Sequence, residues 1–239
     1  MKVEQELPEP KPLTVIELKP DTTETYLRGL TKGSVVDWGD GTKSVVTAEE
    51  AMMKKVKHTY ADTSTANRIV TIDGVLDRSG VEGEPSFDMS ALTAVRSLGE
   101  LKGNLNGLFM GCSELTSIPA GLFDHLTKVT NFTSCFNSCN GLTAIPEGLF
   151  DHLTKVTNFS SCFSGCTGLT VIPEGLFDHC TAVIDFSYCF ALCSNLTAIP
   201  EGLFNQCTAV TNFSACFESC SALTGETPYT MVDGKKVKL

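Results

Sequence analysis

Cysteine is the residue whose number and spacing in this sequence could most directly support chemistry. Eleven cysteines occur among 239 residues, and eight of them form pairs four positions apart, at Cys135/Cys139, Cys162/Cys166, Cys189/Cys193 and Cys216/Cys220. A structural zinc site needs four converging ligands and favours C-x2-C spacing, which these pairs lack. Cys180 and Cys207 occupy positions that Leu126 and Leu153 fill in earlier copies of a repeated motif. Because leucine and cysteine interchange there, we expect buried, reduced thiols, with disulfides between neighbouring copies as the alternative.

Asp-His pairs are the second group that could do chemistry. Such a pair recurs three times at one position of the motif, at Asp124-His125, Asp151-His152 and Asp178-His179. A ladder of carboxylates and imidazoles could hold a divalent metal ion. The fourth copy has Asn205-Gln206 instead, so we expect a solvated turn in which the aspartate hydrogen-bonds locally. The sequence thus predicts no catalytic residue, cofactor or metal site, and a metal-dependent enzyme built on this ladder remains an alternative.

The motif that carries these residues repeats with a fixed period. Gly121–Phe132 returns almost unchanged at Gly148–Phe159, and with substitutions at Gly175–Phe186 and Gly202–Phe213. The period is 27 residues, which is typical of stacked units that cannot bury their apolar faces alone. Within the unit 142–168 we expect a short strand ending in proline, a helical turn, a second extended piece and a second short turn.

The residues before the repeat have the alternation of β-strands. We expect strands at 13–18, 34–38, 56–60 and 67–72, and a short helical insertion at 47–55 with Thr47 as its cap. The predicted organisation is a Pro-rich arm or linker at 1–11, a β-sandwich at 12–83, a repeat solenoid at 84–225 with a degenerate first coil and four better repeats, and a C-terminal cap at 226–239. The predicted fold class is mixed β/α.

Two resemblances to known families follow from these motifs. The residues 36–42, which read Val-Asp-Trp-Gly-Asp-Gly-Thr, and His58-Thr59-Tyr60 resemble the PKD-type immunoglobulin-like module. That resemblance implies a β-sandwich without chemistry, in which Trp38 anchors the core and Asp37 and Asp40 shape a turn. A calcium loop on the two aspartates is the alternative, although it would need more oxygen ligands.

The repeat itself resembles another family. The order Leu-Thr-x-Ile-Pro, Val-Thr-x-Phe, Cys-Phe-x-x-Cys is similar to the BspA-like leucine-rich repeats of bacterial surface proteins, with an inserted Gly-Leu-Phe-Asp-His-Leu turn. This resemblance covers about residues 92–225. It implies adhesion or ligand recognition by an extended surface, on Bacteroidetes-like cells or the phages that infect them, and no catalysis.

A binding face is expected where strand residues point outward. The favoured candidates are Thr116, Ser117, Thr143, Ala144, Thr170, Val171, Thr197 and Ala198. A second outward row runs through Thr130/Asn131, Thr157/Asn158, Ile184/Asp185 and Thr211/Asn212. Both rows read as flat, small and polar, and a solvated face without a ligand is the alternative. Four Asn-x-Ser/Thr sequons lie in the repeat, where asparagine ladders and turn bonds account for them better than glycans.

The net charge of −10 argues against nucleic-acid partners, and the longest apolar stretches are too short to insert in a membrane. Together these features predict a non-enzymatic recognition or adhesion protein on a cell surface or in the extracellular space, with a protein or glycan ligand. The alternative is a structural, decoration or host-binding component of a bacteriophage virion or phage-like particle, contacting other subunits through the 1–11 arm. No signal peptide is recognised in the sequence.

Overall fold

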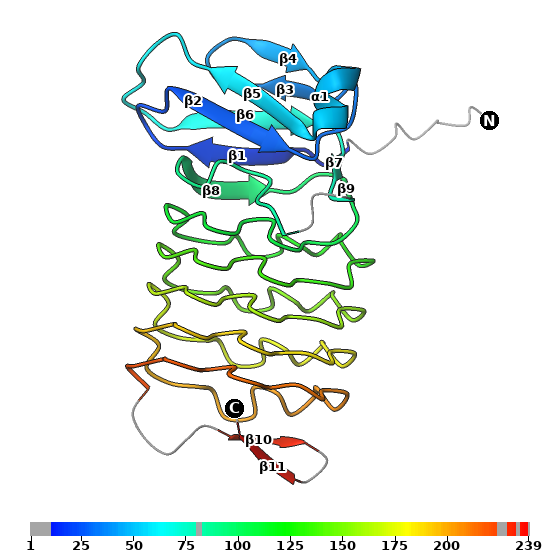
Figure 1. Ribbon diagram of the computed structural model, residues 1–239, viewed down its shortest axis with the longest axis vertical. Helices are drawn as coiled ribbons and strands as arrows, with labels where there is room; N and C mark the ends of the chain where they lie inside the picture. Colours follow the sequence, from blue (N-terminus) through cyan, green and yellow to red (C-terminus); the bar gives the residue numbers. More distant parts are fainter. Residues whose placement is uncertain (1–10, 80–82, 224–228, 233–234, 239) are drawn as a thin grey trace, which may run out of the picture.

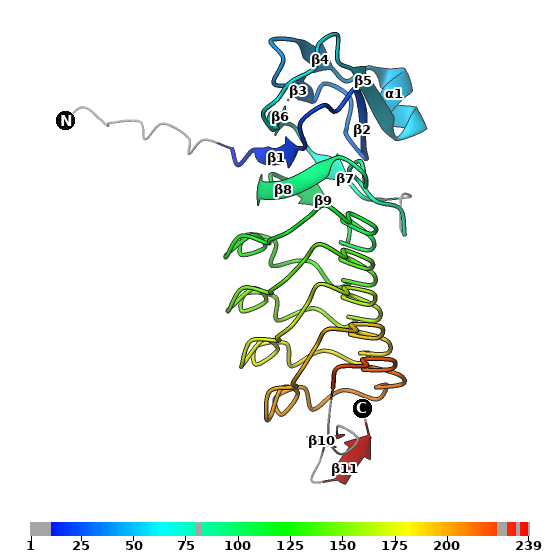
Figure 2. The same ribbon diagram turned by 90° about the vertical axis from the view of Figure 1, so that its left-hand side faces the viewer.

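The computed structural model describes residues 11–79, 83–223, 229–232 and 235–238. An N-terminal antiparallel β-sheet domain spans residues 14–102, and a largely irregular, repeat-like region with regularly spaced buried phenylalanines and cysteines follows it. Figures 1 and 2 show this sheet domain at one end of an elongated stack of similar loops. Nearly all of the Pro-rich arm expected at 1–11 lies outside the described residues.

Five strands form the main sheet, in the order β4-β3-β6-β1-β8, and all neighbours are antiparallel. Their bounds are Thr14–Leu18 (β1), Val35–Asp37 (β3), Lys43–Val45 (β4), Arg68–Asp73 (β6) and Leu92–Ser97 (β8). Separate pairs are formed by β2 (Glu24–Arg28) with β5 (Lys55–Thr59), antiparallel, and by β7 (Leu76–Asp77) with β9 (Leu101–Lys102), parallel.

The four strands expected from the sequence are confirmed to within one residue at each end. Alternate burial along β1 and β6 shows why, because every second side chain of each strand enters the core. Helix α1 (Ala48–Met53) is also confirmed, with Thr47 as its N-cap and a capping box to Glu50. Strands β2, β4, β7 and β9 were not predicted.

Strand β8 belongs to both parts of the molecule. On one side it pairs with β1, so the sheet extends beyond residue 83, where the sequence places the end of the sandwich. On the other side the carbonyl of Thr93 accepts the N–H of Thr116, 3.5 Å away, in the first full repeat. The sheet and the stack are therefore joined through one shared strand (Figure 2).

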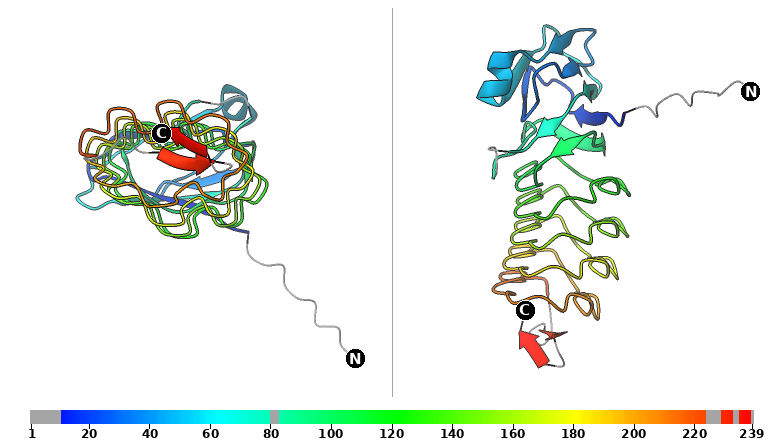
Figure 3. Two further views of the ribbon diagram at one scale, coloured as in Figure 1. Left: turned by 90° about the horizontal axis from the view of Figure 1, so that it is seen from below. Right: turned by 90° about the vertical axis from the view of Figure 1, so that its right-hand side faces the viewer.

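Four full coils follow, and we number them I to IV for residues 115–141, 142–168, 169–195 and 196–222. They superimpose closely when viewed along the stack (Figure 3). Neighbouring coils are joined by backbone hydrogen bonds between a residue and the one 26 positions later, for example from Phe132 to Asn158 (2.9 Å) and from Phe136 to Cys162 (2.8 Å). The same pattern recurs in every coil interface, so the stack is held by a regular backbone ladder.

The strands and helical turns expected within each coil are much reduced. The expected strands shrink to isolated parallel bridges, such as Ala144 with Val171 and Asn158 with Asp185. The expected helical turns are single turns with bonds to the third preceding residue, as from Leu153 to Phe150 (3.0 Å). After the coils, β10 (Tyr229–Val232) and β11 (Lys235–Lys238) pair as an antiparallel hairpin within the segment predicted to be a cap.

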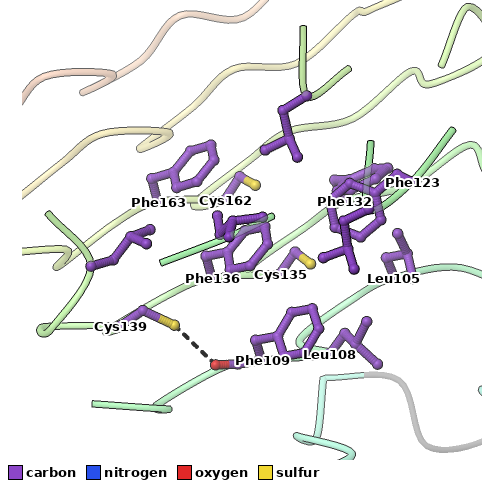
Figure 4. Packing of buried hydrophobic residues seen from close by; sticks show 14 of the residues in the cluster. Leu105, Leu108, Phe109, Phe123, Phe132, Cys135, Phe136, Cys139, Cys162 and Phe163 are labelled. Atoms are coloured by element: carbon purple, nitrogen blue, oxygen red, sulfur yellow. Dashed lines mark hydrogen bonds between the residues drawn. The ribbon is translucent and has the colours of Figure 1, made fainter. Parts of the chain in front are cut away.

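Phenylalanine fills the centre of the stack. All fourteen phenylalanines are buried, and they form three columns that run from coil to coil. The longest column is Phe87, Phe109, Phe136, Phe163, Phe190 and Phe217, with successive ring centroids 5.2–5.5 Å apart. Figure 4 shows part of this column with cysteines packed beside the rings. Phe87 precedes the repeat, so the column also ties the sheet domain to the stack.

Candidate binding surface of the repeat region

The cysteines are confirmed as core residues. All eleven are free and buried. Several thiols donate to a backbone carbonyl 30 residues earlier, as Cys139 does to Phe109 at 3.1 Å (Figure 4) and Cys166 to Phe136 at 3.1 Å. Burial raises the pKa of Cys112 and Cys166 to about 12, so these thiols stay protonated and are poor nucleophiles near neutral pH.

The Asp-His pairs are spread out on the surface. His152 Nε2 lies 4.0 Å from Asp124 Oδ2 of the preceding coil, and both side chains are about half exposed. His125 Nε2 instead lies 3.1 Å from the carbonyl oxygen of Gly99. Among the described residues, no group of three or more His, Cys, Asp and Glu side chains is placed to hold a metal ion.

The turn of the sheet domain is organised by hydrogen bonds. Asp40 Oδ1 accepts from the backbone and hydroxyl of Thr42 (2.9 and 2.6 Å), and its Oδ2 lies 2.9 Å from His58 Nε2. Burial raises the pKa of Asp40, but the hydrogen bonds from Thr42 and His58 outweigh it and lower the pKa to about 2. His58 stacks on Trp38 at 4.6 Å. Both carboxylate oxygens have protein partners, which favours the turn-forming role over the calcium alternative.

The predicted binding face is exposed along its whole length. All eight residues, from Thr116 to Ala198, are exposed. Adjacent coils are linked there by backbone bonds from Thr170 to Thr143 (3.4 Å) and from Thr197 to Thr170 (3.2 Å). Val171 is the one large apolar side chain in this row, and 52% of its surface is exposed.

A second surface row was only partly anticipated. In coil III, Ile184, Tyr188 and Leu192 are spaced four residues apart and are 47%, 47% and 55% exposed. We call these three residues the apolar row. The equivalent residues in the other coils are small or polar, at Thr130/Ser134/Ser138, Thr157/Ser161/Gly165 and Thr211/Ala215/Ser219. Coil III therefore differs from its neighbours at three equivalent positions, and all three of its residues there are exposed.

The backbone conformation also sets Tyr188 and Leu192 apart from ordinary surface residues. Tyr188 and Leu192 have φ angles of 56° and 62°, in the left-handed region that disfavours bulky side chains. Glycine or serine fills the same two positions in the coil before, as Ser161 and Gly165. Large apolar residues at these positions thus serve neither the core nor the local conformation, and strained exposed residues of this kind concentrate at functional sites.

Sequence reasoning missed Tyr188 and Leu192 because it assigned their segment to a short capped turn. A comparison of each position with the residues 27 positions before and after it identifies both residues, because only coil III has large side chains where the other coils have small ones. The sequence predicts that Ile184 faces outward, but it also predicts a small and polar row. The surface is therefore less uniform than predicted, and it includes an exposed aromatic ring.

The asparagines of two sequons make local turn bonds of their own, where the sequence predicts asparagine ladders and Ser/Thr turn bonds. The Oδ1 atoms of Asn131 and Asn158 accept from the backbone two residues later, at 2.8 and 2.7 Å. Asp185 takes the same place in coil III and makes the same bond to Ser187 at 2.7 Å. Coil III therefore keeps the turn but exchanges a neutral amide for a negative charge.

In the part of the chain that the structure describes, no helix is long and apolar enough to cross a membrane. Comparison of the chain with models of known protein families and with curated proteins finds no match.

Proposed function

We propose that this chain is a non-enzymatic recognition or adhesion protein, displayed on an exterior surface and binding a protein or glycan partner through its repeat region. The observation that carries the proposal is the surface of coil III. Val171, Ile184, Tyr188 and Leu192 are exposed there, whereas the other coils have small or polar residues at all four positions. Exposed apolar side chains at otherwise small positions are typical of interaction sites.

The architecture supports this use. Stacked coils with a continuous buried column of rings make a rigid support, because each coil is fixed by its neighbours on both sides. Rigid supports lower the entropy cost of binding at their surface. We propose further that the coils are BspA-like leucine-rich repeats and that the sheet domain is a PKD-type sandwich, on the repeat order and on the packing of Trp38, His58 and Tyr60.

The test is a comparison of the wild-type chain with a surface variant. The variant carries V171A, I184T, Y188S and L192G, each of which is the residue found one coil earlier, so the fold tolerates the replacements. Both proteins are applied to arrays of immobilised glycans and of purified extracellular-matrix proteins. We expect the wild-type chain to bind at least one array component and the variant to lose at least ten-fold in affinity. Equal binding by the two proteins, or no binding by either, would contradict the proposal.

A further inference from the structure

We infer that the apolar row of Ile184, Tyr188 and Leu192 docks a cationic protein segment that carries apolar side chains. This inference rests on the proposed function and narrows it to one coil and one class of partner.

The position of the row indicates a contact made by several side chains at once. Its members are four residues apart on the segment that forms the backbone ladder, and all three are exposed on the same coil. The backbone N–H groups of Tyr188 and Leu192 donate to Ser214 and Glu218 of coil IV, at 2.9 and 2.7 Å, which fixes the backbone beneath both side chains. The apolar row is thus preorganised, because its backbone is held by these hydrogen bonds.

The charge around the row indicates a basic partner. Residues 156–223 contain five carboxylates and no lysine or arginine. Two of the acidic residues adjoin the row through the backbone, since Asp185 follows Ile184 and the carbonyl of Glu218 accepts the N–H of Leu192 at 2.7 Å. Asp185 stands where the other coils have asparagine, and Glu218 stands where they have Asn137, Ser164 and Ala191. The negative charge and the apolar side chains therefore depart from the repeat consensus in the same place.

The same charge disfavours other occupants. A second copy of this chain would bring two acidic surfaces together, and an anionic membrane surface would be repelled. A glycan would find one aromatic ring, but Ile184 and Leu192 offer it neither a hydrogen bond nor a stacking face. A segment with lysine or arginine around a few apolar residues could pair its charges with the carboxylates and pack its apolar side chains on the apolar row.

The experiment is a selection from a phage-displayed library of random 12-residue peptides on the full chain at 50 mM NaCl. Enriched peptides are synthesised, and their Kd values are measured by fluorescence anisotropy. The row variant carries I184T, Y188S and L192G, and the charge variant carries D185N and E218N. The matched control is V45T, which changes an exposed valine of the sheet domain. Circular dichroism confirms that each variant is folded.

We expect the enriched peptides to combine lysine or arginine with aromatic or aliphatic residues. Affinity should fall at least ten-fold in the row variant, at least three-fold in the charge variant and in 500 mM NaCl, and less than two-fold in the V45T control. Peptides without a basic bias, equal affinity for the row variant, or the absence of any binding peptide would overturn the inference. So would self-association that the row variant abolishes, because it would assign the row to a second copy.

The two proposals can fail separately. If the array partner binds the row variant normally but is lost when V171A is added to it, the recognition function stands and the apolar row is not its site. If the arrays show no partner while basic peptides bind the row, the inference stands and the surface-adhesion function does not.

Discussion

The phenylalanine column leads to a quantitative prediction about where the stack is strongest. Phe163 is fully buried and its ring is stacked on Phe136 at 5.4 Å and on Phe190 at 5.5 Å. Phe217 ends the column, with one stacked partner in Phe190 at 5.3 Å. Substitution to alanine at either position removes a buried ring, but only Phe163→Ala breaks the column in the middle.

The expected costs follow from burial and from ring pairing. Replacing a buried phenylalanine by alanine costs about 3–5 kcal/mol. Each favourable ring pair adds about 0.5–1.5 kcal/mol beyond the buried area. We therefore expect Phe163→Ala to lower the free energy of unfolding by about 4–5 kcal/mol and Phe217→Ala by about 3–4 kcal/mol, a difference of ~1 kcal/mol that corresponds to one ring pair.

Urea unfolding provides the assay, because two probes report on different parts of the chain. Trp38 is the only tryptophan and lies in the sheet domain, so its fluorescence follows that domain. Far-ultraviolet circular dichroism follows the whole molecule. The reasoning is refuted if Phe217→Ala costs as much as Phe163→Ala, since the terminal ring would then be held by contacts other than the column.

Three further predictions concern the thiols and the turn of the sheet domain. Burial raises the pKa of Cys112, Cys166 and Cys207 to about 12, above the value of about 8.5 for a free cysteine. The stability that these three thiols contribute is therefore intact below about pH 8.5 and declines as pH rises above it, by up to about 1.4 kcal/mol per pH unit for each of the three. The urea midpoint should fall between pH 8 and pH 10, and a flat profile would contradict the burial of these thiols. Gly39→Ala should destabilise the sheet domain far more than Gly41→Ala in the same unfolding assay, because both have positive φ but only a Cβ at Gly39 would lie 2.5 Å from the carbonyl oxygen of Ile69. Asp40 has a lowered pKa, so its contribution to stability is present above about pH 4 and is lost as pH falls through about 2; D40N should flatten the acid limb of the stability profile, and an unchanged limb would show that other carboxylates set it.

The sequence was most informative where residues exchange at equivalent positions. Leu126 and Leu153 align with Cys180 and Cys207, and that exchange correctly predicted an apolar core for the cysteines. The Asp40-Gly41 turn was predictable because its geometry depends on residues close in sequence. The contact of Asp40 with His58 was not, since it joins residues 18 positions apart.

The features that could not be predicted depend on tertiary context. Leu92–Ser97 reads as the start of the repeat, yet it also pairs with β1, because one strand can serve both the edge of a sheet and the first rung of a stack. The expected strands of each coil shrink to single bridges since the ladder uses turn conformations with left-handed residues. Those conformations set which side chains point outward, and so Tyr188 was not recognised as exposed.

The coil-to-coil backbone ladder also determines how the molecule responds to force. Each coil is held mainly by its two neighbours, so a pull on the C-terminal end loads only the last interface. Because that interface opens one bond after another, coils should peel away singly. Each event would release 27 residues, or about 90 Å of extended chain. The repeat region would then extend in equal steps, one coil at a time, starting with the coil farthest from the sheet domain.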